Sequence, residues 1–189
     1  MKKRYKAVII GGSAGGIDGV MRILRDLSPG IPIPIFIVLH RLKNVYSHLD
    51  QILGDGTGYT HVKDADEKES IQPYYAYLAP VNYHLLFEED HTFSLDVSEQ
   101  VNYSRPSIDV SFESAAALYR GELLGILLSG ANSDGAKGMH RIREYGGYTI
   151  VEDPATAYAP TMPQAALDLV EVHKVVKKED IAFEVKRLI

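Results

Sequence analysis

The fold of this chain is decided by Lys6-Ala7-Val8-Ile9-Ile10-Gly11-Gly12-Ser13-Ala14-Gly15-Gly16, an apolar run that ends in closely spaced glycines. A continuous apolar run is typical of a parallel strand that is buried on both faces. Beyond the glycines, apolar residues recur at helical spacing from Ile17 to Leu27, and Ser28-Pro29-Gly30 ends that helix. The stretch therefore predicts a buried strand, a tight turn and a helix, which is the repeating unit of an α/β fold.

Outward from this unit, strand-like and helix-like patterns alternate. A second buried strand is predicted at 35–39 and ends at His40, and segments 83–87 and 92–97 predict an antiparallel hairpin. The other expected elements are strands at 74–79, 123–128, 148–151 and 172–176, and helices at 47–53, 107–119, 136–145 and 179–188, with one more starting at Pro163. We expect a single domain over residues 1–189: a doubly wound, mostly parallel sheet with helices on both faces and one antiparallel β-hairpin.

The composition excludes several classes of protein. The chain has 189 residues, no cysteine and a formal net charge of −5. Without cysteine it has neither disulfides nor thiolate metal ligands, which favours a cytoplasmic location over a secreted one. No apolar run reaches the ~20 residues of a membrane-spanning helix, so no membrane insertion is expected. The negative charge argues against a nucleic-acid partner.

The glycine-rich loop around Ser13 admits several interpretations. A phosphate-binding loop of the GxxxxGK type is excluded because Ile17-Asp18 stands where the lysine is needed. A dinucleotide loop is excluded because Ser13 replaces the second glycine, which must let the pyrophosphate approach. Gly11-Gly12-Ser13-Ala14-Gly15 matches the GxSxG nucleophile elbow, although an α/β-hydrolase has this motif well inside its chain. The structural alternative is that Ser13 only caps the following helix.

A nucleophilic serine needs a positioned base, and His40 is the best-placed histidine. It ends the second strand, and consecutive strands are usually neighbours, so its ring can reach the first loop. His84 is the one competitor, and we expect it to be structural or peripheral. The remaining histidines lie in polar or peripheral stretches: His48, His61, His91, His140 and His173.

The acidic partner expected for His40 is Asp134, in the loop after the apolar strand at 123–128. A carboxylate behind the imidazole fixes its tautomer. The structural alternative is an N-cap of the helix at 136–145. Because Ser13, His40 and Asp134 each follow a separate strand, all three should open on one edge of the sheet. No metal site is expected, and the acidic run Asp64-Ala65-Asp66-Glu67 is interpreted as a solvated loop.

Five motifs follow one another along the chain: Val8 to Gly16 with His40 at the next strand end, Ala76 to Pro80 with His84 after it, Arg105 to Phe112, Gly125 to Gly130 continuing to Ser133 to Met139, and Met162-Pro163. In these motifs, from Ala7 to about Leu167, the chain resembles the catalytic domain of the CheB family of chemotaxis receptor methylesterases. The resemblance implies a Ser–His–Asp triad that maps onto Ser13, His40 and Asp134. It implies hydrolysis of glutamyl methyl esters on the cytoplasmic helices of chemoreceptors, sometimes with glutamine deamidation.

The chain departs from the family pattern close to the expected site. Ala14 stands where serine or threonine is usual, Arg41 where methionine is usual, and Ala131-Asn132 where a Met-Gly pair is usual. With Met162, these residues are expected at the substrate rim, namely Arg41, Ala131, Asn132 and Met162. The family's receiver domain is not seen in this sequence, so we expect activity without phosphorylation, and a separate regulatory protein stays open as a partner.

The expected reaction is acyl transfer to water, without a cofactor. Backbone N–H groups at Ala14, Gly15 and Gly16, at a helix N-terminus, are expected to stabilise the oxyanion. Two alternatives remain open. One is an esterase or deamidase that acts on another protein or a small molecule, and the other is a non-catalytic interaction module that kept the fold.

Overall fold

A seven-stranded parallel sheet forms the centre of the molecule in this computed structural model, which describes residues 5–41 and 48–189. The strand order is β3-β4-β2-β1-β7-β8-β9. The strands are β1 (Ala7–Gly12), β2 (Ile35–Leu39), β3 (His61–Asp64), β4 (Tyr75–Leu78), β7 (Leu123–Leu127), β8 (Tyr148–Glu152) and β9 (Lys174–Val176). Because β1 and β2 are apolar and covered on both faces, they are fully buried, as the sequence predicted.

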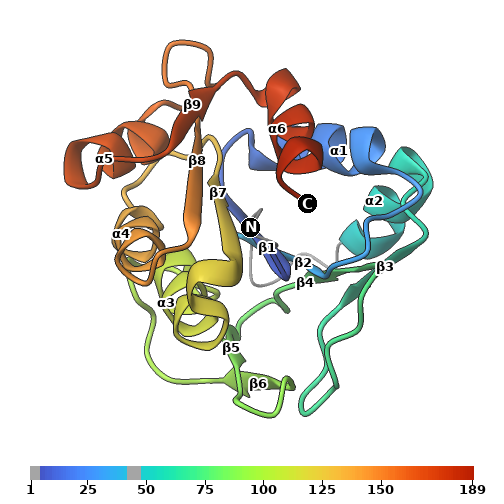
Figure 1. The fold of residues 1–189 in the computed structure, drawn as a ribbon. Coiled ribbons are helices and arrows are strands. Elements are labelled where there is room, and N and C mark those ends of the chain that lie inside the picture. Colours follow the sequence, from blue (N-terminus) through green and yellow to red (C-terminus); the bar gives the residue numbers. More distant parts are fainter. Residues whose placement is uncertain (1–4, 42–47) are drawn as a thin grey trace.

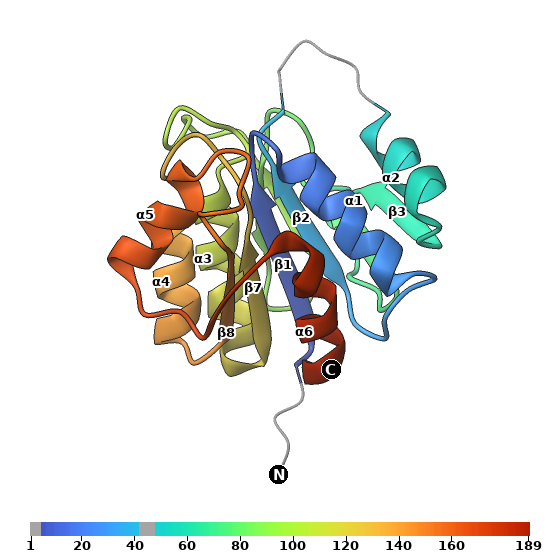
Figure 2. The same ribbon diagram turned by 90° about the horizontal axis from the view of Figure 1, so that it is seen from above.

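Helices cover both faces of this sheet (Figures 1 and 2). One face carries α1 (Gly16–Leu27), α2 (Leu49–Thr57) and α6 (Ile181–Leu188), and the other carries α3 (Ile108–Tyr119), α4 (Ala136–Glu144) and α5 (Thr161–Leu169). Single 3₁₀ turns at 120–122 and 178–180 precede β7 and α6. Alternate residues of β1 serve the two cores: Val8 and Ile10 face the α1 side, and Ile9 faces the α3 side.

The expected hairpin is present as β5 (His84–Phe87) and β6 (Phe93–Asp96), which pair in antiparallel fashion. The two strands form a separate sheet that is not hydrogen-bonded into the main one. Phe87 and Phe93 bury their rings beside Phe36 of β2, with centroid distances of 4.5 and 5.8 Å. The doubly wound architecture expected from the sequence is confirmed, with the hairpin as an addition to the α3 face.

Some element boundaries differ from expectation. β3 was not predicted because it is a short edge strand without a buried apolar face. Asp64, expected in a solvated loop, is its last residue and pairs with Arg41 at 3.0 Å. Helix α5 starts at Thr161, two residues before Pro163, because proline is tolerated throughout a first helical turn. The helix expected at 47–53 runs from Leu49 to Thr57, and residue 47 lies outside the described residues.

The topology creates a crevice at the carboxyl end of β1. In the strand order, β1 lies between β2 and β7. Helix α1, which connects β1 to β2, covers one face of the sheet, whereas α4, which follows β7, covers the other face. Ligands of open α/β sheets bind at such a switch point, beyond the strand ends. The register pairs Gly12 with Leu39 and Gly11 with Leu127, so the loops that follow β1, β2 and β7 open side by side.

Candidate active site

Ser13 lies in a turn that the backbone holds without help from its hydroxyl. Its N–H donates to the Ser129 carbonyl at 2.9 Å, and its carbonyl accepts from Gly16 N–H at 2.8 Å. The N-cap of α1 is Gly15, at a φ of 81°, and no side chain caps this helix. The alternative that Ser13 serves as a helix cap is therefore wrong, and its half-buried hydroxyl is free for another role.

In this turn, two of the three backbone N–H groups expected to stabilise the oxyanion remain available to a substrate. The N–H of Gly16 is turned inward to the Ser13 carbonyl, so it cannot also bind a substrate oxygen. Ala14 and Gly15 remain as candidates. Position 15 favours glycine for two reasons. Its φ is positive, and a Cβ here would lie 2.7 Å from the Cβ of Tyr158.

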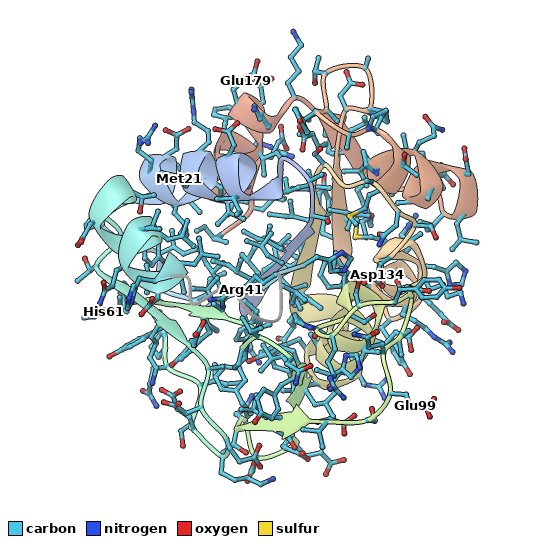
Figure 3. The ribbon with its side chains drawn as sticks, turned by 180° about the vertical axis from the view of Figure 1, so that it is seen from behind. Met21, Arg41, His61, Glu99, Asp134 and Glu179 are labelled. Carbon is cyan, nitrogen blue, oxygen red and sulfur yellow. The ribbon has the colours of Figure 1, made fainter. Side chains whose placement is uncertain are left out.

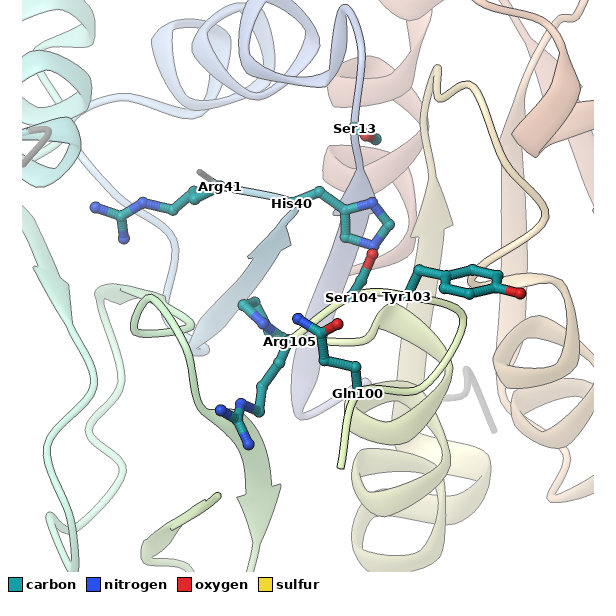
Figure 4. Close-up of a pocket in the computed structure, with 8 residues that line it drawn as sticks. Ser13, His40, Arg41, Gln100, Tyr103, Ser104 and Arg105 are labelled. Atoms are coloured by element: carbon teal, nitrogen blue, oxygen red, sulfur yellow. The ribbon is translucent and has the colours of Figure 1, made fainter. Parts of the chain in front are cut away.

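His40 follows β2 and its ring enters the same cleft as Ser13 (Figure 4). Its backbone N–H donates to Gly12, and its Nε2 lies 2.8 Å from Asp134 Oδ2. An ionised carboxylate only accepts hydrogen bonds, so Nε2 carries the proton and Nδ1 is left as the basic nitrogen. This is the reverse of the serine-protease arrangement, in which the aspartate binds Nδ1.

Asp134 is fully buried yet well supplied with hydrogen-bond donors. The five donors are His40 Nε2 at 2.8 Å, Asn102 Nδ2 at 2.8 Å, Ser107 Oγ at 2.9 Å, Ile108 N at 2.7 Å and Asp109 N at 3.1 Å. Burial alone raises the pKa of this carboxyl, but the bonds from His40, Asn102 and the backbone outweigh it and lower the pKa overall. Asp134 is therefore an anion at neutral pH, with its charge at the positive end of α3.

Two aspartates cap each other's helices across the α3–α4 contact. Asp134 precedes α4 but binds the first two N–H groups of α3, whereas α4 has no side-chain cap of its own on Gly135. Asp109, in the first turn of α3, accepts from Gly135 N–H at 2.9 Å and Gly138 N–H at 2.8 Å. The alternative that Asp134 caps α4 is therefore wrong, because its carboxylate turns to the neighbouring helix α3. Burial, together with the nearby Asp134 charge, raises the pKa of Asp109.

Asn102 joins the two aspartates and was missed by the sequence analysis. Its Nδ2 donates to Asp109 at 2.9 Å and to Asp134 at 2.8 Å. It has a φ of 52°, a left-handed conformation that asparagine tolerates better than most residues. The one available signal was an asparagine three residues before the Arg105-Pro106-Ser107 segment. The sequence gives no sign that Asn102 bridges Asp109 and Asp134, because that contact depends on how two distant loops pack together.

His84 is buried and structural, in line with expectation. Its Nδ1 accepts the backbone N–H of Ser107 at 3.1 Å, so its Nε2 is the protonated nitrogen that donates to the Glu99 carbonyl at 3.0 Å. Both ring nitrogens are used to hold the segment before α3. His84 therefore supports the acidic network from behind and does not line the cleft beside Ser13.

A cleft of about 360 Å³ opens in front of Ser13 and His40. Its described lining is Ser13, His40, Arg41, Gln100, Tyr103, Ser104, Arg105 and Pro106. Arg105 donates to the Val97 and Ser98 carbonyls and to Asn82, which ties down the loop on this side. In the same view Arg41 extends away from the His40 ring (Figure 4), towards Asp64.

The expected substrate rim is only partly at the surface. Arg41 lines the cleft and Ala131 is exposed, whereas the Asn132 side chain accepts the N–H of Asp134 at 3.1 Å. Met162 is fully buried beneath Gly130, where a Cβ would lie 2.4 Å from its Cε. Its place at the rim is therefore corrected: Met162 packs under the loop that carries Asp134. Figure 3 shows Arg41 and Asp134 near the middle of the molecule, with His61 and Glu179 at its periphery.

The serine turn is tied to its neighbours through Ser129. The Ser129 hydroxyl donates to the Ala14 carbonyl at 2.7 Å and accepts the Ala159 N–H at 2.7 Å. Its backbone N–H donates to Glu152 at 2.8 Å. Burial raises the pKa of Glu152, which is only 2% exposed. One hydroxyl thus links the loops after β1, β7 and β8.

Within residues 5–41 and 48–189, no cluster of three or more histidine, aspartate or glutamate side chains has the arrangement of a metal site. No helix in that part of the chain is long and apolar enough to cross a membrane.

Comparison with known proteins identifies the same family that the motifs resemble. The family model for CheB methylesterase matches residues 8–185. A Leptospira interrogans protein named as a protein-glutamate methylesterase/protein-glutamine glutaminase is 46% identical over 94% of this chain and 92% of its own length. A Thermotoga maritima protein-glutamate methylesterase/protein-glutamine glutaminase is 32% identical over 86% of this chain, which spans 48% of that relative. The crystal structure of the Thermotoga maritima CheB methylesterase catalytic domain superposes with a TM-score of 0.92, at 30% identity, over 98% of this chain and 99% of that one.

Proposed function

The chain belongs to the CheB methylesterase family, and from that premise and the site geometry we propose that it hydrolyses glutamyl methyl esters on chemoreceptors. Ser13 is the nucleophile, His40 the general base and Asp134 its anionic partner. The substrates are methylated cytoplasmic helices of receptors, which places the enzyme in the cytoplasm. Glutamine deamidation is the same acyl transfer with ammonia as the leaving group, and the names of the relatives include it.

The mechanism follows from the proton positions at His40. Nδ1 takes the Ser13 proton as Oγ attacks the ester carbonyl, and the resulting imidazolium is stabilised by Asp134 through Nε2. The N–H groups of Ala14 and Gly15 stabilise the tetrahedral oxyanion; one such donor contributes about 10²–10³ in kcat. Collapse breaks the bond to methoxide, which receives the proton from Nδ1 and leaves as methanol. Water then attacks the acyl-enzyme with the same proton relay, which restores Ser13 and yields the glutamate carboxylate.

The observation that carries this proposal is the 2.8 Å contact between His40 and a fully buried, ionised Asp134, at the strand edge where Ser13 opens. A buried carboxylate that stays ionised is the group that can stabilise a protonated imidazole beside it.

The proposal is tested with the purified chain in two assays. Methanol release is measured from a methylated chemoreceptor fragment, and a fluorophosphonate probe reports an activated serine. We expect wild type to be positive in both assays and Ser13→Ala to be negative in both with an unchanged circular dichroism spectrum. Ser94→Ala, in β6 on the hairpin, is the matched serine control and should behave as wild type.

The pattern of results separates the alternatives. Labelling without methanol release would leave a serine hydrolase with another substrate. Absence of both would indicate a non-catalytic module, and equal methanol release by Ser13→Ala would refute the assigned nucleophile.

A further inference from the structure

Two tyrosines stand out in the described part of the chain because their rings lie in solvent. Tyr103 is 97% exposed and Tyr158 is 82% exposed, the highest values among the large hydrophobic side chains there. Tyr103 lines the cleft that contains Ser13 and His40. Tyr158 lies against Gly15, two residues from Ser13, on the loop before α5. The two rings therefore belong to different loops at the same catalytic edge.

The backbone conformation at Tyr103 is one that favours glycine. Val101 and Ser104 exchange backbone hydrogen bonds of 3.2 and 3.0 Å around the two residues between them. Those residues have positive φ angles, 52° at Asn102 and 59° at Tyr103, as in a type I′ turn, whose preferred sequence is Asn-Gly. Asn102 uses the turn to reach Asp109 and Asp134.

The Tyr103 ring, by contrast, gains almost no burial within the protein that would offset this strain. In the close-up it extends away from the His40 ring (Figure 4). The bonds of Asn102 account for the turn but not for a tyrosine where glycine would fit, and a residue kept in a disfavoured conformation is a reason to look for a functional role.

The chemistry of the rings points to the type of ligand. Tyrosine offers a large, rigid surface with an apolar face and a polar tip, at a small cost in side-chain entropy. The ester must reach Ser13 inside the cleft, so groups at the lip meet what surrounds the ester and not the ester itself. A small ester would leave these rings uncovered, whereas a polypeptide that carries the ester on a side chain would cover them.

We propose that Tyr103 and Tyr158 form an aromatic lip that binds the polypeptide on either side of the scissile glutamyl ester. This inference rests on the proposed function. The two rings select protein substrates over small esters, and the triad beneath them supplies the chemistry to both.

The test compares two substrates across matched variants. The variants are Tyr103→Gly, which suits the positive φ, Tyr158→Ala and the double variant. Tyr74→Gly controls the first change, because Tyr74 has a φ of 67° and is 51% exposed but precedes β4 at the opposite edge of the sheet. Phe183→Ala, 67% exposed on α6, controls the second. The substrates are a methylated chemoreceptor cytoplasmic fragment, followed by methanol release, and p-nitrophenyl acetate.

We expect each tyrosine variant to raise KM for the receptor fragment about tenfold, and the double variant more, with kcat close to wild type. The ratio of kcat/KM for the fragment to kcat/KM for the small ester should fall by a similar factor. Both controls should keep the wild-type ratio. An unchanged ratio in the double variant, with wild-type methanol release intact, would overturn the lip and leave the proposed function standing. Absence of methanol release by wild type, with the small ester still hydrolysed, would overturn both.

Discussion

The two halves of the candidate site, one around Asp134 and one around the proposed nucleophile Ser13, are built in opposite ways. Asp134 is fully buried and receives five hydrogen bonds from three parts of the chain. Ser13 is half-buried in a glycine turn, and what holds the turn is its own backbone and the hydroxyl of Ser129.

The difference follows from what each half must do. A buried anion is stable only when many donors point at it, so the acidic half is fixed by its neighbours. A nucleophile must stay accessible and change its bonding during the reaction. The turn around Ser13 fits this proposed role, because it shapes the backbone and leaves the hydroxyl uncommitted. Substitutions on the acidic side should therefore cost stability and activity together, and those on the serine side should cost activity with little loss of stability.

The largest effect is expected for Asp134→Asn. The amide keeps the shape of the carboxylate but loses its charge, and its NH₂ group must face hydrogen-bond donors. We therefore expect kcat/KM to fall at least about 100-fold, which is about 2.7 kcal/mol of transition-state stabilisation. A role as a helix cap alone would predict melting within a few degrees of wild type, because asparagine caps a helix nearly as well as aspartate. The five donors now predict a loss of about 1–3 kcal/mol in the free energy of unfolding, the cost of a donor left unpaired. Urea unfolding and methanol release measure the two effects, with the exposed Asp168→Asn as control. Near-normal rates would remove Asp134 from the triad.

A smaller effect is expected for Asn102→Gly, which keeps the left-handed turn but removes the amide between Asp109 and Asp134. The Asn102 amide lowers the pKa of Asp134, so its loss makes that carboxylate more basic. Activity that needs this carboxylate as an anion is then lost at a higher pH, so the acid limb of the pH–rate profile should move to higher pH. We expect kcat/KM at neutral pH to fall about tenfold, or 1.4 kcal/mol.

Asn82→Gly is the matched control for this change, since Asn82 also has a positive φ but binds Arg105. Its acid limb should stay where wild type has it. An equal shift in both variants would assign the change to the turn's backbone and not to the amide.

Ser129→Ala tests the serine side. It removes the hydroxyl between the Ala14 carbonyl and the Ala159 N–H, so the turn should loosen without unfolding. We expect kcat to fall about threefold to tenfold, or roughly 0.7–1.4 kcal/mol, with about 1 kcal/mol lost in stability. Ser133→Ala, at an exposed serine of the same loop, is the control. A large loss of stability with unchanged kcat would reverse the distinction between the two halves.

The smallest effect is expected for Glu152→Gln, which keeps an acceptor for the Ser129 N–H but removes a buried charge. Burial raises the folded-state pKa of Glu152, so the native state binds this proton more tightly than the unfolded state does. Its ionisation therefore destabilises the native state as pH rises from the unfolded-state pKa through the folded-state pKa. The difference in Tm between Glu152→Gln and wild type should grow in favour of the variant from pH 4 to pH 7. Glu89→Gln, an exposed carboxylate, should show no such trend; a constant difference for Glu152→Gln would mean that its carboxyl titrates normally.

The sequence by itself determined the layered architecture and the edge at which the site opens. A buried parallel strand appears in the sequence as a continuous apolar run. Because the strands are parallel, the residues that follow such runs share one edge of the sheet. The positions of Ser13, His40 and Asp134 after β1, β2 and β7 could therefore be predicted without any contact being known.

Only the tertiary structure decided how these residues are held. It showed that His40 presents Nε2 to Asp134, that Asp134 caps α3 while Asp109 caps α4, and that Asn102 bridges the two carboxylates. It also moved Met162 from the rim to the core. A local sequence pattern reports which residues a segment buries. It cannot report which donor from a distant loop a side chain meets, because that depends on how the α3 and α4 N-termini pack together in space.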